Sequence, residues 1–202
     1  MTAGITGSNH FPTTIFQYEV PDAAERNERL YELAKRLQSE DPDGTQRSNA
    51  GGGWHSSDRL DLLDVPALNA LLTLIVDTAT VVTGGMGFVD QQLALSAAWF
   101  VVSPAGASNL RHCHPRSFLS GAYYVKAPPG SSSLCFHDPR PVKLHATPSS
   151  TNFPVTPYTT EAVNCQVREG LLVIFPGWLD HSVPAHRTEG ERVVLSFNFV
   201  AL

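Results

Sequence analysis

The feature that most constrains the fold is a series of short strand-like segments between about residue 90 and the end of the chain. Each segment is rich in β-branched and aromatic residues, and Gly, Pro, Asn, Asp or Ser separates it from the next. The segments are residues 92–102, 118–125, 132–136, 162–166, 171–175 and 192–200. Closely spaced strands of this kind predict an all-β jelly roll or small barrel.

The first 90 residues have a different pattern and predict supporting elements. Residues 13–20 are β-branched and aromatic, which indicates a first strand. Apolar residues then recur at helical spacing, namely Leu30, Leu33, Ala34 and Leu37. The polar, Gly-rich residues 41–53 predict a loop.

A second helix is expected over residues 64–83, with Asp64 as its N-cap and Pro66 in its first turn. We therefore predict one mainly β domain over residues 1–202 with flanking helices. Residues 1–90 form a helical and strand support region, and residues 91–202 form the β core.

Composition narrows the class of partner. Of the 202 residues, 42% are apolar and 16% are charged, and the net charge is −5, so no basic surface for nucleic acid is expected. The most apolar stretch, residues 65–82, contains Asn69 and Asp77 and predicts a buried helix, with no membrane partner. Three unpaired cysteines and the absence of a secretory signal pattern predict a cytoplasmic protein, and a homodimer is compatible with the sequence.

Three histidines have a spacing that suits a metal. His112 and His114 are two residues apart, so in an extended strand their side chains point to one face. His181 follows the strand-like residues 171–175 through a Pro-Gly-Trp turn. In a double-stranded β-helix, which is a jelly-roll or cupin-like barrel, an early His-x-His and a late histidine converge in the barrel mouth. Imidazole suits Fe, Zn, Cu and Ni, and histidines also serve as core or surface residues.

Arg192 adds an anion-binding group. It begins the apolar residues 192–197 and shares one strand face with Val194 and Ser196. A buried arginine is costly unless an anion meets it, and a dicarboxylate cosubstrate would be such an anion. An internal salt bridge to an acidic side chain is the alternative.

These residues resemble the prolyl-hydroxylase-like branch of the iron(II)/2-oxoglutarate oxygenases. The sequence is also similar to a group of bacterial and phage oxygenases of this kind, which share five motifs. They are His-x-His-Pro, here at 112–115, Leu-Ser-Gly-x-Tyr-Tyr-Val at 119–125, Phe-x-Asp-Pro-Arg at 136–140, Phe-Pro-x-Trp-Leu-x-His at 175–181 and Ser-Phe-Asn-Phe at 196–199. Ser-Asn at 48–49 and Gly-Gly-Trp at 52–54 extend the resemblance to about residue 45.

The resemblance implies a double-stranded β-helix, Fe(II) and O2 as cofactors, and 2-oxoglutarate as cosubstrate. It implies that His112 and His181 bind iron. It also implies that Arg192 binds the far carboxylate of 2-oxoglutarate, and that the hydroxyl groups of Tyr124 and Ser196 donate to that carboxylate. The expected reaction hydroxylates an unactivated C–H bond of a small or amino-acid-like molecule and releases succinate and CO2.

The sequence departs from the family at the third iron ligand. The usual triad is two histidines and one carboxylate, but His114 occupies the carboxylate position. Three arrangements are compatible with the sequence. His114 binds the iron as a third histidine, or His114 does not bind and water completes a site of two histidines. In the third, an acid such as Asp138 is the third ligand.

Two other functions are compatible with the sequence. A cupin-like three-histidine dioxygenase without 2-oxoglutarate explains the histidines but leaves Arg192 without a ligand. A non-catalytic binding module on a barrel is the second, because a fold does not fix a function. The Pro-rich residues 139–157 predict either a lid over a substrate or a surface loop.

Overall fold

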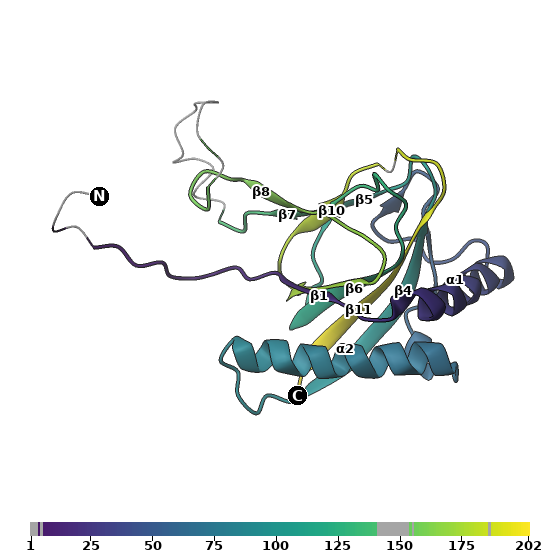
Figure 1. The fold of residues 1–202 in the computed structure, drawn as a ribbon, viewed down its shortest axis with the longest axis horizontal. Helices are drawn as coiled ribbons and strands as arrows, with labels where there is room; N and C mark the ends of the chain where they lie inside the picture. The colour runs from purple at the N-terminus through teal and green to yellow at the C-terminus, as the bar shows by residue number, and fades with distance from the viewer. Residues whose placement is uncertain (1–3, 5, 141–153, 155, 186) are drawn as a thin grey trace.

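Two antiparallel β-sheets face each other and form the body of the molecule (Figure 1). The computed structural model describes residues 4, 6–140, 154, 156–185 and 187–202. The larger sheet has the strand order β1-β9-β6-β11-β4-β3. Its strands are β1 (Phe16–Glu19), β3 (Trp54–His55), β4 (Leu93–Ser103), β6 (Leu119–Lys126), β9 (Leu171–Pro176) and β11 (Arg192–Ala201).

The smaller sheet has the order β2-β5-β10-β7-β8, and its strands are antiparallel as well. They are β2 (Asn49–Ala50), β5 (Ser108–His112), β7 (Leu134–His137), β8 (Ala162–Cys165) and β10 (His181–Val183). Strands that are distant in sequence are therefore neighbours in each sheet. This arrangement confirms the predicted mainly β fold of two packed sheets.

Side chains of the larger sheet alternate between two hydrophobic cores, as a pleated strand requires. On β11, Val193, Leu195 and Phe197 belong to the core that contains the helices, whereas Val194 belongs to the core between the sheets. The core between the sheets also contains residues of the smaller sheet, such as Phe136 of β7. The candidate site lies at this second core.

The helices pack on the outer face of the larger sheet (Figure 1). They are α1 (Ala23–Glu40), the single-turn helix η1 (Leu60–Leu62) and α2 (Pro66–Gly85). Helix α1 buries Leu30, Leu33 and Ala34 on one face, which confirms the predicted helical spacing. It is also joined to β6, because the Tyr123 hydroxyl donates to Oδ1 of Asn27 at 2.7 Å.

Helix α2 begins differently from the expectation that Asp64 would be its N-cap. Val65 is the N-cap residue, and no side chain caps the helix. Val65 is extended because it precedes Pro66, and a proline at the first helical position has no N–H that needs a cap. Helix α2 is also long and apolar enough to span a membrane, but the core helices of many proteins have the same length and composition. In this structure α2 contributes Leu68, Leu71 and Ile75 to the core.

The predicted strands are present, with ends that move by up to three residues. The prediction of a loop over residues 41–53 was wrong at β2, a two-residue strand that pairs with β5. Strands β5 and β10 were not predicted. The region from 1 to 90 also contributes strands to both sheets, since β1 and β3 belong to the larger sheet and β2 to the smaller one. Residues 141–153 and 155, which make up most of the predicted lid or surface loop, lie outside the described residues.

Candidate metal centre

His112 and His181 are held together by strand pairing. His112 is the last residue of β5 and His181 is the first residue of β10, and the two are direct partners in the antiparallel register. Directly opposed residues point to the same face of a sheet, so both imidazoles face the second core. Their ring centroids are 4.3 Å apart.

His114 joins this pair from outside a strand. It lies beyond the end of β5, where its backbone N–H donates to the carbonyl of Gly177 at 2.8 Å. Its ring centroid is 5.2 Å from that of His112 and 5.1 Å from that of His181. The expectation that His112 and His114 share a strand face is therefore wrong, although their side chains converge. A Cβ at Gly177 would lie 2.3 Å from the carbonyl oxygen of Ser117, so this close turn requires glycine.

The three imidazoles offer one ligand atom each within 4.8 Å of one another. Nδ1 of His112 lies 2.7 Å from the carbonyl of Leu110, and Nδ1 of His181 lies 2.9 Å from the carbonyl of Leu179. A carbonyl only accepts, so Nδ1 carries the proton in both rings and Nε2 keeps its lone pair. Metal-binding histidines commonly have this arrangement.

His114 lacks such a carbonyl among the hydrogen bonds of the described residues. Its Nδ1 lies 3.5 Å from the amide nitrogen Nδ2 of Asn198, and Oδ1 of the same amide accepts from the Ser120 hydroxyl at 2.7 Å. An amide nitrogen donates, so Nδ1 of His114 is the acceptor in this contact. The structure therefore fixes two imidazoles for metal binding more firmly than the third.

Burial keeps the three rings neutral at pH 7. Burial first, and then the charges of neighbouring histidines, lower the pKa of His114 to about 3 and that of His181 to about 4. Burial also lowers the pKa of His112. A neutral imidazole has the lone pair that a metal needs. The donor set therefore fits a divalent transition metal.

Asp138 is placed elsewhere. Its carboxylate pairs with Arg140 at 2.8 Å and lines a second cavity of about 400 Å³. Among the described residues it is not part of the group of converging ligand atoms. The geometry thus favours His114 over Asp138 as the third ligand.

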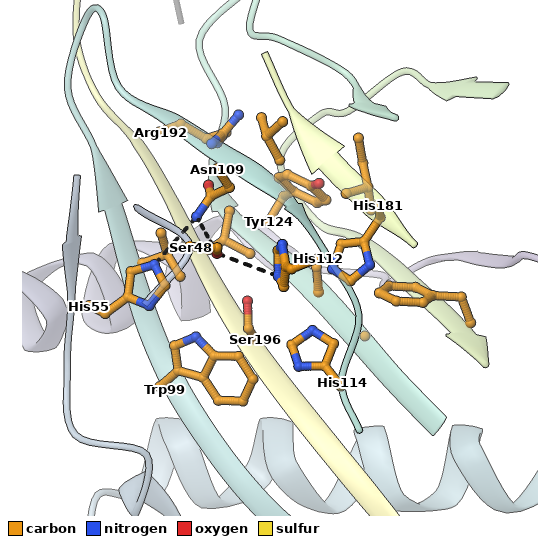
Figure 2. A pocket seen from close by; sticks show the side chains of 17 residues that line it. Ser48, His55, Trp99, Asn109, His112, His114, Tyr124, His181, Arg192 and Ser196 are labelled. Atoms are coloured by element: carbon orange, nitrogen blue, oxygen red, sulfur yellow. Dashed lines mark hydrogen bonds between the residues drawn. The ribbon is translucent and has the colours of Figure 1, made fainter. Parts of the chain in front are cut away.

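The imidazoles line a cavity of about 60 Å³ together with Arg192 and Tyr124 (Figure 2). Arg192 is 2% exposed, and within the described part of the chain it has no acidic partner. Its Nη2 donates to Oγ of Ser103 at 3.2 Å and its Nη1 to the carbonyl of Ser132 at 3.4 Å, while Nε has no hydrogen-bond partner. The alternative of an internal salt bridge is not realised among these residues.

Tyr124 and Ser196 both line the cavity but differ in position. Burial raises the pKa of Tyr124, so its hydroxyl stays protonated and can donate. Ser196 shares the inner face of β11 with Arg192, yet four residues of strand, about 13 Å, separate them. Figure 2 shows Ser196 near Trp99 and His114, far along the strand from Arg192.

Several cavity residues were not found from the sequence. Ser103 pairs with Arg192 in the register of β4 and β11. Trp99 lies four residues before Ser103 on β4 and pairs with Ser196. The predicted strand over residues 92–102 contains Trp99, but residues 97–102 are all apolar and do not indicate which face of the strand meets the site. Ser48, His55 and Asn109 also line the cavity, but they come from short strands or their edges that carry little sequence signal.

Comparison with protein families decides the classification. A family model described as "Putative 2OG-Fe(II) oxygenase" matches residues 97–198, which is half of the chain. The chain belongs to this 2-oxoglutarate/Fe(II) oxygenase family. The matched residues include the three histidines, Tyr124, Arg192 and Ser196, and the family uses Fe(II), 2-oxoglutarate and O2. A search of curated proteins found no match.

Solved structures of oxygenases share the fold of this family member. A prolyl-4-hydroxylase from Pseudomonas putida has a TM-score of 0.64 at 17% identity, over 93% of this chain and 92% of that one. The α-ketoglutarate-dependent epimerase SnoN has a TM-score of 0.68 at 16% identity, over 93% and 78%. HygX from Streptomyces hygroscopicus, solved with nickel and 2-oxoglutarate, has a TM-score of 0.58 at 14% identity, over 93% and 82%. These similarities confirm the double-stranded β-helix.

Proposed function

We propose that this oxygenase is a hydroxylase that acts on an unactivated C–H bond of a small or amino-acid-like molecule. One observation carries the proposal. A single cavity contains three converging imidazoles and a buried guanidinium that lacks an acidic partner among the described residues. In the balanced reaction, 2-oxoglutarate, O2 and R–H give succinate, CO2 and R–OH. One oxygen atom enters succinate and the other enters the product.

The imidazoles are assigned to the metal. His112 and His181 bind it through Nε2, because their Nδ1 protons are held by backbone carbonyls. His114 is the third ligand, since its ring faces the same space. Ferrous iron, when bound, supplies the activation of dioxygen that cleavage of such a C–H bond requires. Oγ of Ser48 lies 3.4 Å from Nε2 of His112, and this long contact would be replaced if Nε2 held the metal.

Arg192 and Tyr124 are assigned to the far carboxylate of 2-oxoglutarate. The guanidinium offers the unpartnered Nε, and its two weak hydrogen bonds can be exchanged for stronger ones to an anion. The protonated Tyr124 hydroxyl adds a donor. Ser196 remains a predicted donor, located toward the histidine end of the cavity.

The remaining cavity wall excludes water. Val101, Leu134, Phe175 and Val194 line it and belong to the core between the sheets. A dry wall strengthens the charge interactions at Arg192 and limits side reactions of the activated centre. The chain therefore orients the cosubstrate and shields it from solvent.

Succinate formation tests the proposal. The purified protein with Fe(II), O2 and 2-oxoglutarate should release succinate, and removal of the metal by a chelator should stop the release. Oxygen consumption that does not require 2-oxoglutarate would favour the three-histidine dioxygenase instead. Failure to bind both metal and 2-oxoglutarate in calorimetry would favour a binding module.

Hydroxylation itself needs a product measurement. SnoN, which has the same fold, is an epimerase, so the fold leaves the outcome open. With substrate candidates, a mass gain of one oxygen atom supports hydroxylation, whereas an unchanged mass contradicts it.

The cytoplasmic location, the absence of nucleic-acid and membrane partners, and a homodimer remain predictions. Light scattering of the purified protein tests whether it is a homodimer.

A further inference from the structure

Unpartnered buried nitrogens concentrate in the cavity. Among the described residues, four buried side-chain nitrogens have no hydrogen-bond partner, and three of them belong to residues that line this cavity. They are Nε of Arg192, Nδ1 of His55 and Nε1 of Trp99. A buried polar atom without a partner is costly, so three in one cavity indicate missing ligands. The proposed function uses Arg192 and leaves the other two unexplained.

Both remaining nitrogens are hydrogen-bond donors. Nε1 of Trp99 can only donate. Nε2 of His55 lies 3.4 Å from the amide nitrogen Nδ2 of Asn109. An amide nitrogen can only donate, so Nε2 accepts this hydrogen bond and the proton of the neutral His55 ring is on Nδ1. Burial, with the charge of Arg47, lowers the pKa of His55 to about 4, so the ring is neutral at pH 7. The missing partner must therefore be an acceptor.

Strand register explains why the two donors meet. His55 of β3 lies opposite Val101 of β4, and Trp99 lies two residues along β4 on the same face. Diagonal neighbours of this kind are about 7–8 Å apart at the backbone, which leaves room for an atom between large side chains. Figure 2 shows these ring nitrogens of His55 and Trp99 turned toward each other beside Ser196.

The charge of the cavity favours an anionic acceptor. Its described lining contains Arg192 and several neutral donors, but no Asp or Glu. The guanidinium of Arg47 lies 5.6 Å from the centre of the Trp99 ring, so a positive charge is close to one of the two donors. Arg47 also pairs with Asp58 at 2.7 Å.

We infer that the primary substrate carries a carboxylate, and that this group binds between Nε1 of Trp99 and Nδ1 of His55. This inference rests on the proposed function and specifies its substrate class as small carboxylic acids, such as amino acids or their acyl derivatives. The carboxylate accepts one hydrogen bond from each ring. The donors anchor the substrate from β3 and β4, while Arg192 of β11 anchors the cosubstrate.

The test uses the indole N–H signals of the protein labelled with 15N-tryptophan. The protein is loaded with zinc and 2-oxoglutarate and titrated with N-acetylglycine at pH 7.5. The Trp99 signal, assigned with Trp99→Phe, should move downfield and saturate. The other two indoles are internal controls, because Trp54 donates to the Asp41 carbonyl at 2.8 Å and Trp178 is 54% exposed. N-acetylglycinamide, which has nearly the same shape but no charge, should cause a much smaller shift.

Variants test each donor separately. Trp99→Phe and His55→Leu should each weaken N-acetylglycine binding about tenfold or more, as expected for loss of a hydrogen bond to a charged group. Trp178→Phe, a change on the surface, should leave it unchanged. The Trp99 signal of the wild-type protein gives the answer even where His55→Leu fails to fold, and Trp178→Phe and the 2-oxoglutarate-independent Trp54 signal allow its assignment by elimination where Trp99→Phe fails to fold.

Two results would overturn the inference. One is a Trp99 signal that does not respond to N-acetylglycine, which would mean that a buried water or a side chain occupies the gap. The other is an equal response to N-acetylglycinamide, which would indicate a neutral acceptor. Calorimetric binding of 2-oxoglutarate to the zinc form is measured first, so a protein that binds it but ignores the probe refutes only this inference. A protein that binds no 2-oxoglutarate refutes the proposed function.

Discussion

Replacing Arg192 by Met should have opposite effects on cosubstrate binding and on stability. Arg192 is 2% exposed and makes two hydrogen bonds of 3.2 and 3.4 Å, while its Nε makes none among the described residues. Burial of this poorly solvated charge also lowers its pKa. The side chain is therefore suited to binding an anion and contributes little to the fold of the free protein.

The two magnitudes follow from this geometry. Loss of one partner of a buried, hydrogen-bonded charge pair costs about 2–5 kcal/mol, and about 1.4 kcal/mol corresponds to a factor of ten. The affinity for 2-oxoglutarate should thus fall by about 30-fold or more. Burying an apolar chain of similar length in place of an unpaired charge should leave the free energy of unfolding unchanged or raise it by about 1 kcal/mol or more.

Two measurements check this prediction. Calorimetry of 2-oxoglutarate binding to the zinc form gives the change in affinity, and urea denaturation of the metal-free protein gives the change in stability. Arg59→Met is a matched control, because Arg59 is 53% exposed in its side chain and pairs with Asp61 at the surface. The control should change neither quantity by more than about 0.5 kcal/mol.

Two outcomes for Arg192→Met would contradict these expectations, and each has its own meaning. An unchanged affinity for 2-oxoglutarate in Arg192→Met would show that the guanidinium does not bind the cosubstrate. A loss of stability of several kcal/mol would show that Arg192 has a structural partner in the folded protein.

Three further predictions concern pH, the third ligand and packing. The metal-free protein should lose stability as the pH falls from about 6.5 to about 4, because the lowered pKa of His55 keeps it neutral when folded while the unfolded chain takes up a proton. The full effect is about 3 kcal/mol for this residue, measured by urea denaturation at several pH values, and a flat profile would contradict it. Asn198→Asp should place a carboxylate acceptor beside Nδ1 of His114 and raise zinc affinity about tenfold, whereas an unchanged affinity in competition with a chelator would mean that His114 is not a ligand. Gly121→Ala should destabilise the protein by about 1–3 kcal/mol in thermal or urea unfolding, because its Cβ would lie 2.3 Å from the Phe197 ring. Gly85→Ala is the control, with open space at its Cβ, and equal effects of the two changes would refute the packing argument.

The fold was predictable where periodicity is strong. The long strands β4, β6, β9 and β11 and the helices α1 and α2 have clear strand or helix patterns, and the structure confirms them. Strands β5 and β10 were missed because they are short, and their polar residues face a cavity and solvent in place of a continuous core. The elements that carry His112 and His181 were therefore the hardest to predict.

The site was predictable only in part for the same reason. The histidines and Arg192 were identified from chemistry and from the resemblance, and the structure brings them to one cavity. The tautomers of His112 and His181 depend on carbonyls that only the folded backbone positions. Similarly, the pairing of Arg192 with Ser103 follows from the register of β4 and β11, which no local pattern encodes.

The metal ligands and the anion-binding arginine lie on opposite sheets. His112 and His181 belong to β5 and β10 of the smaller sheet, whereas Arg192 belongs to β11 of the larger one. In the proposed complex, 2-oxoglutarate therefore spans the gap between the sheets, with one end at the metal and the other at the guanidinium. The spacing of the two sheets then sets the length of the carbon chain that can contact both the metal and Arg192. A 2-oxo diacid one carbon shorter should therefore bind more weakly, and the packing of the core between the sheets, which lines the cavity, selects the cosubstrate by its length.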